Sequence, residues 1–228
     1  MNIPVHVAII PDGNRRWARA RKLPDVEGHR VSSEKVVPQI IETLSNAGVK
    51  YFTFWALSTE NAKKRSKEEY ANLLGLMKFF LERRVTKLHK KNVRIRVIGN
   101  VGSFPENIQK SIAKATDLTK DNTGITVIFG ISYGGRDEII RGIHKAVSEG
   151  KVNDLTVDNF GDFLDTKGIP DPDLIIRTGG EKRVSGFMLW QSEYAEYYFT
   201  DKLFPDFSPD DFEDAVAIFN KTERRFGK

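Results

Sequence analysis

Short runs of apolar residues recur along the chain, and each run ends at a glycine, a proline or a polar residue. Their length and their content of β-branched and aromatic side chains are typical of buried strands. Five runs cover residues 6–10, 51–57, 93–98, 124–129 and 174–176, and a sixth candidate covers residues 197–199. The pattern therefore predicts about six strands.

Between these runs the apolar residues recur every three or four positions, which is the spacing of one face of an α-helix. The longest such stripe covers residues 70–88, and shorter ones cover residues 37–44, 108–115, 139–147 and 210–219. Strands that alternate with helices predict βαβ units, and hence a mainly parallel sheet covered on both faces. The expected fold class is α/β.

Composition supports one ordinary globular domain over residues 1–228, since no linker-like segment divides the sequence. Hydrophobic residues make up 39% and charged residues 29% of the chain. The apolar runs are far shorter than the roughly 20 residues that span a bilayer, and no signal peptide is evident at the start. We therefore expect a cytoplasmic location. Cysteine is absent, which excludes disulfides, thiolate nucleophiles and cysteine-based metal sites.

The net charge of +5 is compatible with a nucleic acid, an anionic membrane surface or a phosphorylated small molecule. The positions of the arginines decide between these partners better than the total does. Ligands of parallel sheets bind beyond the carboxyl ends of strands, near the next helix, so we expect the ligand-binding residues at these strand ends.

The end of the first predicted strand is rich in groups that suit a phosphate and a cation. Asp12 could ligate a hard cation, and Gly13 allows a ligand to approach the backbone. Asn14 would begin a helix, and Arg15 and Arg16 add forked donors for phosphate oxygens. The alternative is a plain turn in which Asp12 caps a helix with a solvated basic face.

Two further strand ends carry candidate chemistry. Residues 177–186 hold two adjacent glycines, two arginines and two hydroxyls, which is typical of a loop that cradles phosphate, although the P-loop spacing is absent. Residues 58–61 could position a substrate, or Ser58 could simply cap the next helix. His29 could contact a phosphate, but a lone histidine is more often structural.

Together these segments resemble the cis-prenyltransferase family, whose best-known members are undecaprenyl diphosphate synthases. The resemblance extends over nearly the whole chain, with the motifs in order and at matching spacing. It is carried by residues 6–17 (HVAIIPDGNRRW), 28–30 (GHR), 58–61 (STEN), 133–136 (YGGR), 173–181 (DLIIRTGGE), 183–185 (RVS), 189–191 (LWQ), 194–196 (YAE) and 223–227 (ERRFG).

The resemblance implies a parallel sheet of about six strands surrounded by helices, without the Rossmann dinucleotide-binding topology. It implies a homodimer that uses Mg²⁺ to condense isopentenyl diphosphate sequentially, in cis, onto an allylic prenyl diphosphate. The products would be a Z-polyprenyl diphosphate and diphosphate. A transient contact with a membrane surface could accompany product release, and no nucleic acid is expected.

The resemblance also implies roles for individual residues. Asp12 and Asn61 are the catalytic candidates, and Asp12 would hold Mg²⁺ together with Glu196 of a second subunit. Because a neutral amide is a poor base, we expect Asn61 to position the substrate and a diphosphate oxygen to accept the proton. The substrate-binding candidates are Gly13, Asn14, Arg15, Arg16, Trp17, His29, Ser58, Thr59, Glu60, Lys64, Arg65, Arg177, Arg183, Val184 and Ser185.

Within that set, the first strand end would hold the allylic diphosphate and the fifth would hold isopentenyl diphosphate. Trp17 would pack beside the allylic chain. The stripe over residues 70–88 is expected to wall an apolar tunnel for the growing product, facing strands that end at Ala56 and Phe129. The small residues Ala56 and Gly130 would leave room for it.

The sequence departs from the family pattern at several positions. Ala62 follows the 58–61 motif where an aromatic residue is usual, and an apparent insertion leaves Lys64 or Arg65 as the substrate contact. Asp25 stands where many relatives have an arginine, and Lys182 replaces a histidine. These changes bear on primer preference and product length more than on the reaction.

Three other functions fit parts of the sequence. A non-catalytic, lipid-binding relative of the family is disfavoured because the whole set of charged site residues is present. An RNA-binding module would need an aromatic stacking platform among its cations, which the sequence lacks. A phosphatase with Asp12 as nucleophile would need a second aspartate two residues later, where Asn14 stands.

Overall fold

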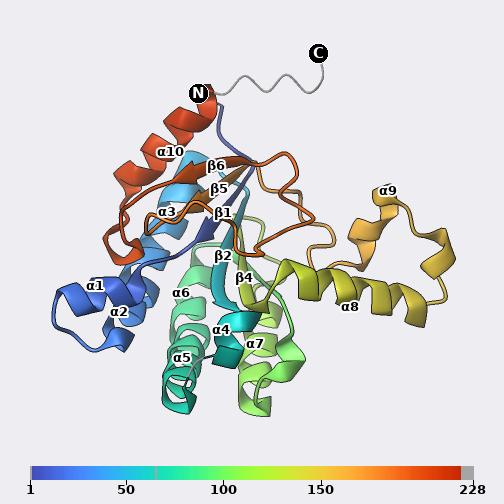
Figure 1. Ribbon diagram of the computed structural model, residues 1–228, viewed down its shortest axis with the longest axis horizontal. Coiled ribbons are helices and arrows are strands. Elements are labelled where there is room, and N and C mark those ends of the chain that lie inside the picture. Colours follow the sequence, from blue (N-terminus) through green and yellow to red (C-terminus); the bar gives the residue numbers. More distant parts are fainter. Residues whose placement is uncertain (1, 65, 222–228) are drawn as a thin grey trace.

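The computed structural model describes residues 2–64 and 66–221, and within them six strands form one wholly parallel sheet (Figure 1). The sheet order is β3-β4-β2-β1-β5-β6. The strands are β1 (His6–Ile10), β2 (Tyr51–Ser58), β3 (Arg94–Ile98), β4 (Thr126–Tyr133), β5 (Leu174–Arg177) and β6 (Glu196–Phe199). Each predicted strand is confirmed, including the sixth candidate.

The helices lie between the strands, as the apolar spacing predicts. They are α1 (Asn14–Ala20), α2 (Asp25–Val31), α3 (Val37–Ala47), α4 (Thr59–Lys64), α5 (Lys67–Phe79), α6 (Val85–Lys90), α7 (Glu106–Thr119), α8 (Gly135–Ser148), α9 (Val157–Phe160) and α10 (Pro209–Lys221). Two π-helical turns, η1 (Ser32–Val36) and η2 (Phe80–Arg84), join α2 to α3 and α5 to α6. Short 3₁₀ turns are η3 (Val101–Ser103), η4 (Val152–Asp154), η5 (Gly161–Phe163) and η6 (Phe204–Asp206).

The register of the central strands determines where the site can form. β1 lies between β2 and β5, and Ile10 at the end of β1 is paired with Arg177 at the end of β5. Because the strands are parallel, the segments that follow these two residues leave the sheet at the same edge. The two candidate phosphate-binding segments, which begin at Pro11 and Arg177, are thereby brought side by side.

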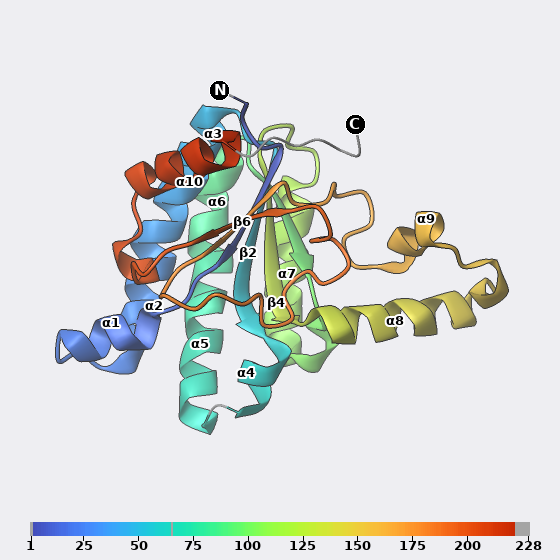
Figure 2. The same ribbon diagram turned by 45° about the horizontal axis from the view of Figure 1, so that its top comes forward.

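The two faces of the sheet are covered differently. One face carries Val7, Phe52 and Phe129 among other buried side chains, and α3, α6, α7 and α10 pack on it. The other face carries Ala8 and Ile128, and its cover includes the non-helical segment around Phe187. Both faces are covered, as expected, but the helices gather on the first (Figure 2).

The long apolar stripe over residues 70–88 forms one continuous helical rod, made of α5, η2 and α6. It begins at Ser66, whose hydroxyl accepts a hydrogen bond from the backbone N–H of Glu69 in a capping box. The π turn inserts an extra residue at the point where Phe80 and Leu81 enter the core.

The apolar stripe of α8 does not face the core. Ile140, Ile143 and Val147 are 54%, 38% and 54% exposed, whereas the buried face carries Glu138 and Ala146. Periodicity over residues 139–147 predicts the helix correctly, and the structure places its apolar stripe on the exposed face. The reason is that Glu138 joins a buried polar network instead of leaving this side to apolar residues.

That network explains why a carboxyl can lie in the interior. The Tyr133 hydroxyl donates to Glu138 Oε2 at 2.6 Å, the Gln191 side chain donates to the same oxygen at 3.1 Å, and the Asp165 N–H donates to Oε1 at 3.1 Å. Burial raises the pKa of Glu138. Three donors satisfy the carboxyl, so α8 is anchored by hydrogen bonds where a core helix would use apolar contacts.

The expectation that Gly130 makes room for a tunnel is wrong. Successive residues of a strand point to opposite faces, so Gly130 lies on the other face from Phe129. A Cβ on Gly130 would lie 3.3 Å from Cδ1 of Trp55, so the glycine accommodates that indole ring.

The contact between α1 and α2 gives a test of how tightly the site-bearing segment is packed. A Cβ on Gly28 would lie 2.0 Å from the carbonyl oxygen of Asn14, whereas one on Gly75 of α5 would meet nothing within 4 Å. Gly28→Ala is expected to lower the free energy of unfolding by about 1–3 kcal/mol, because backbone must move. Gly75→Ala, the matched control, should stabilise the protein by roughly 0.5–1 kcal/mol. Urea denaturation checks both, and equal values for the two variants would contradict the packing.

Candidate active site

A cavity of about 780 Å³ opens at the carboxyl ends of β1 and β2, between α1, η1 and α5. Its interior is apolar and is walled by Leu73, Leu74, Met77, Phe80, Leu81 and Phe129. The middle of the 70–88 stripe, with Ala56 and Phe129 opposite, lines it as expected. The predicted site residues that line it are Asp12, Gly13, Asn14, Arg15, Arg16, His29, Ser58, Glu60, Asn61, Arg177 and Ser185.

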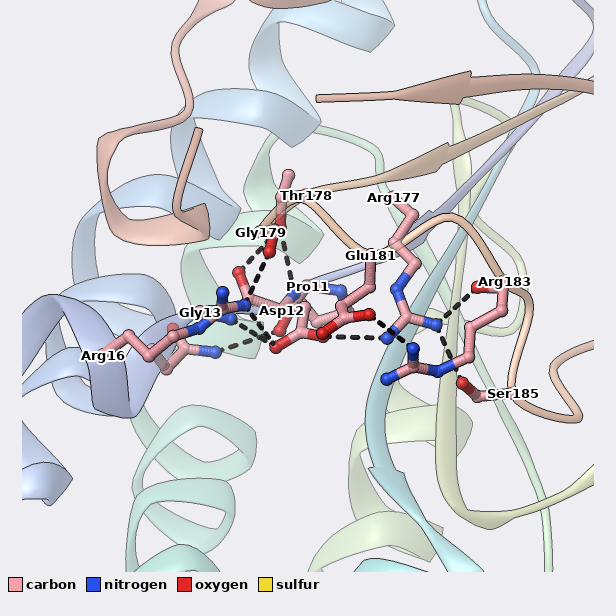
Figure 3. Close-up of polar contacts among 11 residues, drawn as sticks. Pro11, Asp12, Gly13, Arg16, Arg177, Thr178, Gly179, Glu181, Arg183 and Ser185 are labelled. Atoms are coloured by element: carbon pink, nitrogen blue, oxygen red, sulfur yellow. Dashed lines mark hydrogen bonds and ion pairs between the residues drawn. The ribbon is translucent and has the colours of Figure 1, made fainter. Parts of the chain in front are cut away.

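Asp12 lies at the centre of the polar mouth, and both of its carboxylate oxygens accept hydrogen bonds (Figure 3). Oδ1 accepts from the backbone N–H of Gly13 at 2.6 Å and from Nη2 of Arg16 at 3.3 Å. Oδ2 accepts from Nη2 of Arg177 at 2.8 Å. Cations from β1–α1 and from β5 therefore converge on one carboxylate.

Arg177 is the buried partner in this cluster, with a side chain only 5% exposed. Its Nη1 donates to the hydroxyl of Ser185 at 2.8 Å and to the carbonyl of Arg183. Its Nε is buried and has no hydrogen-bond partner among the described residues. Because a buried charge needs a counter-charge, the Arg177 guanidinium is stable in this position only while it is paired with Asp12. Its Nε–H remains available to a ligand.

Thr178 and Gly179, which the sequence places in a phosphate-cradling loop, instead contact the segment that follows β1. The Thr178 hydroxyl donates to the Asp12 carbonyl at 2.8 Å and accepts from the Asp12 N–H at 2.9 Å. The Gly179 carbonyl accepts from Arg16 Nη2 at 2.7 Å. The signal that could have found these contacts is the predicted parallel sheet, in which the segments after the strands leave at one edge.

Gly13 is required by the backbone at the start of α1. Its φ of 101° is left-handed, and a Cβ there would lie 2.7 Å from Cδ2 of Leu203. The glycine thus allows the turn that carries the chain from Asp12 into Asn14.

Asn14 is buried and is held on both sides of its amide. Its oxygen accepts from the hydroxyl of Ser32 at 2.5 Å, and its nitrogen donates to the carbonyl of Pro11 at 3.1 Å. Ser32 and Ser33 lie in η1 and line the cavity, a position that the sequence did not indicate. The amide of Asn14 therefore ties the first strand end to the π turn.

Arg15 is engaged by Asp25, the residue that departs from the family pattern. Arg15 Nε donates to Asp25 at 2.7 Å, and Arg19 donates to both oxygens of the same carboxylate at 2.8 and 2.7 Å. Hydrogen bonds from Arg19 and then Arg15 hold the pKa of Asp25 at about 2. Arg19 lines the cavity and was not expected from the sequence.

Other predicted residues lie around the mouth without lining the cavity. The Trp17 indole N–H donates to Asp206 at 2.7 Å, and the ring packs 4.2 Å from the guanidinium carbon of Arg21. The Arg183 side chain is 61% exposed and pairs with Glu181. None of these five side chains lines the cavity.

Val184 packs against the core of the second sheet face. Thr59 begins α4 beside Gly134, and the Thr59 hydroxyl would lie 2.6 Å from a Cβ on that glycine. Neither Val184 nor Thr59 lines the cavity. Lys64 ends α4, whereas Arg65 lies outside the described residues, as does the 223–227 motif.

Glu196 lies apart from Asp12 within the chain. It begins β6, where it is paired with Leu174 at the amino end of β5, while Arg177 ends that strand. In the described part of the chain, no group of three or more histidine, aspartate or glutamate side chains could hold a metal ion. A cation at Asp12 would therefore have to take most of its ligands from a substrate or from water.

The cavity thus combines a cationic mouth with an apolar interior. A family model described as "Putative undecaprenyl diphosphate synthase" matches residues 10–227. The chain belongs to this family of cis-prenyltransferases, and it is an enzyme of that class.

Individual relatives agree over the full length. An isoprenyl transferase of Clostridium perfringens is 43% identical over 99% of this chain and 90% of its own, and one of Rhizobium meliloti is 44% identical over 99% and 93%. The crystal structure of lavandulyl diphosphate synthase from Lavandula x intermedia, in complex with dimethylallyl diphosphate, matches with a TM-score of 0.93 and 38% identity, covering 99% of each chain. A probable undecaprenyl diphosphate synthase from Campylobacter jejuni matches with 0.84 and 32%, covering 100% of each. Among the described helices, none has the length and hydropathy needed to cross a bilayer.

The Asp25 cluster predicts how the mouth would respond to a lost carboxylate. Asp25→Asn should strengthen binding of inorganic pyrophosphate by about two- to fivefold, because Arg15 and Arg19 lose an exposed ion-pair partner. Isothermal titration calorimetry measures the change. Asp117→Asn, which removes an equal charge from an exposed pair with Lys120, is the control. Unchanged or weaker binding by Asp25→Asn would contradict the prediction.

The same carboxylate predicts a pH dependence of stability. The pKa of Asp25 is about 2 in the folded protein, below the 3.8 of a free side chain. The stabilisation is therefore complete above about pH 4 and is lost as the pH falls through about 2. Urea denaturation of the wild type and Asp25→Asn should show a difference in unfolding free energy that shrinks over this range.

Proposed function

We propose that the enzyme condenses isopentenyl diphosphate, sequentially and in cis, onto an allylic prenyl diphosphate, with release of diphosphate and formation of a Z-polyprenyl diphosphate. The observation that carries the proposal is that one cavity has both a mouth lined by Asp12, Arg16 and Arg177 and an apolar interior. The mouth fits a diphosphate, and the interior fits an isoprenoid chain. The relative from Lavandula x intermedia was solved with dimethylallyl diphosphate, which supports a substrate of this class.

The arginines of the mouth would stabilise the negative charge that develops when the allylic C–O bond breaks. The Arg16 side chain is 51% exposed at the mouth, whereas the Arg177 side chain is buried and hydrogen-bonded to Ser185. The unpaired Nε of Arg177 offers one donor that no described residue uses. Preorganised donors of this kind are effective because they need no reorientation as charge develops.

Asp12 fits Mg²⁺, although only in part. Mg²⁺ is commonly held by one or two carboxylates together with substrate phosphates and water, and Asp12 supplies one carboxylate. When bound, the ion would offset charge on the departing diphosphate. Arg16 contacts Oδ1 of Asp12 and Arg177 contacts Oδ2, so neither oxygen is free for the ion. An entering diphosphate would first have to attract these two cations away from Asp12.

Asn61 and its neighbours would orient the second substrate. The backbone N–H of Asn61 donates to the hydroxyl of Ser58 at 3.0 Å, which fixes the start of α4 at the cavity mouth. The Asn61 side chain is exposed there, beside Glu60. We propose that it positions the substrate, and that a diphosphate oxygen accepts the proton lost from the new chain.

Product analysis tests the proposed reaction. The purified protein is incubated with radiolabelled isopentenyl diphosphate and C10, C15 or C20 allylic primers, with and without Mg²⁺, and the products are sized. Mg²⁺-dependent formation of longer prenyl diphosphates is expected. The absence of turnover with every primer would favour a non-catalytic lipid-binding subunit instead.

Asp12→Asn should lower kcat/KM by at least about a hundredfold. The variant should still fold, but with a lower free energy of unfolding, because the buried Arg177 loses its counter-charge. The amide keeps the size and some hydrogen-bonding capacity of the carboxyl but cannot offer an anionic ligand. Pyrophosphate release measures turnover, and circular dichroism checks folding. Asp206→Asn is the control, since Asp206 pairs with Arg21 outside the cavity. Near-wild-type turnover in Asp12→Asn would refute the metal assignment.

We also propose that the enzyme is a homodimer that pairs through α8. Its exposed stripe of Ile140, Ile143 and Val147 is the kind of contiguous apolar face that a second copy would cover. Dimerisation would also give Glu196 a role, because it lies away from Asp12 of its own chain and could contribute to a metal site only from a second subunit.

Ile143→Glu should convert the dimer to a monomer, because a charge would be buried without a partner at the interface. Size-exclusion chromatography with light scattering gives the mass in solution. Leu118→Glu on α7 is the control, since Leu118 is 42% exposed and Ile143 is 38% exposed. A wild-type protein that is monomeric, or an Ile143→Glu variant that stays dimeric, would contradict this interface.

A further inference from the structure

A second cavity, of about 420 Å³, lies between α3 and α6 and is called the α3–α6 groove here. Ile41, Leu88 and Val93 line it, and each is no more than 6% exposed, so they form its floor. Arg84 and Lys87 also line it. The α3–α6 groove thus combines an apolar floor with cationic walls.

The charge in the α3–α6 groove is not balanced. Lys91 pairs with Glu42 at 3.0 Å, which accounts for the acidic residue that lines the groove. Arg84 and Lys87 have no ion pair within the described ranges 2–64 and 66–221. The Nε of Arg84 is buried and has no hydrogen-bond partner there. A buried guanidinium donor without a partner is unusual in a folded protein and indicates an anionic ligand.

The surface around the α3–α6 groove continues this excess of positive charge. Residues 83–94 contain six arginines and lysines and no acidic residue. Among the described residues, Lys91 is the one of the six with an ion pair. The arginines at the main cavity differ, because Arg15, Arg16 and Arg177 are each paired with an aspartate.

We propose that the α3–α6 groove binds the phosphate head of an anionic membrane lipid and thereby docks the enzyme on an anionic bilayer. The head would take the place of a counter-ion beside Arg84 and Lys87, and the hydrocarbon would cover the half-buried Pro38 and the aliphatic part of the exposed Lys87 side chain. A nucleic acid or an acidic peptide would use the charge but would leave this apolar surface uncovered. The combination of the two features therefore favours an amphiphile.

The position of the α3–α6 groove gives this docking a consequence. Val37 and Leu81 line the main cavity, whereas Ile41 and Arg84, about one helical turn further along the same two rods, line the groove. Docking would bring the apolar end of the main cavity close to the bilayer. The hydrocarbon chain of a product in the main cavity would then lie close to the lipid bilayer, in which it is soluble.

Vesicle co-sedimentation tests the charge requirement. The full chain should bind vesicles of phosphatidylglycerol and phosphatidylcholine but not vesicles of phosphatidylcholine alone. Arg84→Gln/Lys87→Gln should bind about thirtyfold more weakly, since each cation near an anionic bilayer contributes roughly fivefold. Lys145→Gln/Lys151→Gln, the control, removes equal charge from exposed positions on or just after α8 and should bind like the wild type. Equal binding by the two double variants, or binding to both kinds of vesicle alike, would overturn the proposal.

Ser45→Trp tests the groove itself without changing charge, because the exposed Ser45 lines it and an indole would fill it. Titration with a short-chain, monomeric phosphatidylglycerol should show binding to the wild type and its loss in Ser45→Trp. Wild-type binding by Ser45→Trp, or equally tight binding of polyglutamate to the wild type, would overturn the proposal. Turnover of water-soluble primers without lipid should be unchanged in every variant, which separates this docking from the reaction.

Discussion

The ion pair between Asp12 and the buried Arg177 holds together the edge of the sheet on which the site is built. Neither group is stable alone in that position, because Arg177 is almost fully removed from water and Asp12 is the acid that neutralises it. Through Ser185 and the carbonyl of Arg183, the same guanidinium also orders the loop that follows β5. One pair therefore positions two loops and leaves a mouth in which positive charge is concentrated.

This arrangement also links the mouth to the interior. The backbone of Asp12 is fixed by Thr178, the left-handed Gly13 turns the chain into α1, and Asn14 ties α1 to η1 through Ser32. The π turn η1 and the π turn η2 both place side chains on the cavity. Polar contacts at the sheet edge thus determine where the apolar walls meet, so the charged mouth and the apolar interior depend on the same contacts.

Much of the fold follows from the sequence because strands and helices have distinct apolar periods. The six strands and the helical rod over residues 70–88 follow from this pattern. The parallel pairing of β1 and β5 then places the two candidate phosphate-binding segments together. The outward direction of the α8 stripe does not follow from the sequence, because periodicity shows that a helix is amphipathic but not what its apolar face contacts. The small size of Gly130 suggests room for a tunnel, but the alternation of strand residues places it on the other face of the sheet.

The sequence predicted which segments form the site, but not which side chains contact one another within it. Asp12, Asn61 and Arg177 do line one cavity, because strand ends bring them there. Sequence could not show that Arg16 and Arg177 share Asp12, or that Asp25 engages Arg15, since such pairings depend on distances between separate elements. The contacts of Trp17 with Asp206 and Arg21 could not be predicted either, because Asp206 lies on a separate element.

The π turn η2 has a consequence for how this architecture could diversify. Five residues, Phe80–Arg84, occupy a turn that accommodates one more residue than a regular helix would. A turn of this kind spreads its extra residue over nearly the same rotation as a regular turn, so deleting one of the five would restore an α-helix and leave the facing of α5 relative to α6 nearly unchanged. Leu73, Leu74 and Met77 would then stay on the cavity wall. Such a rod can change its length by one residue without turning its inner surface away from the cavity.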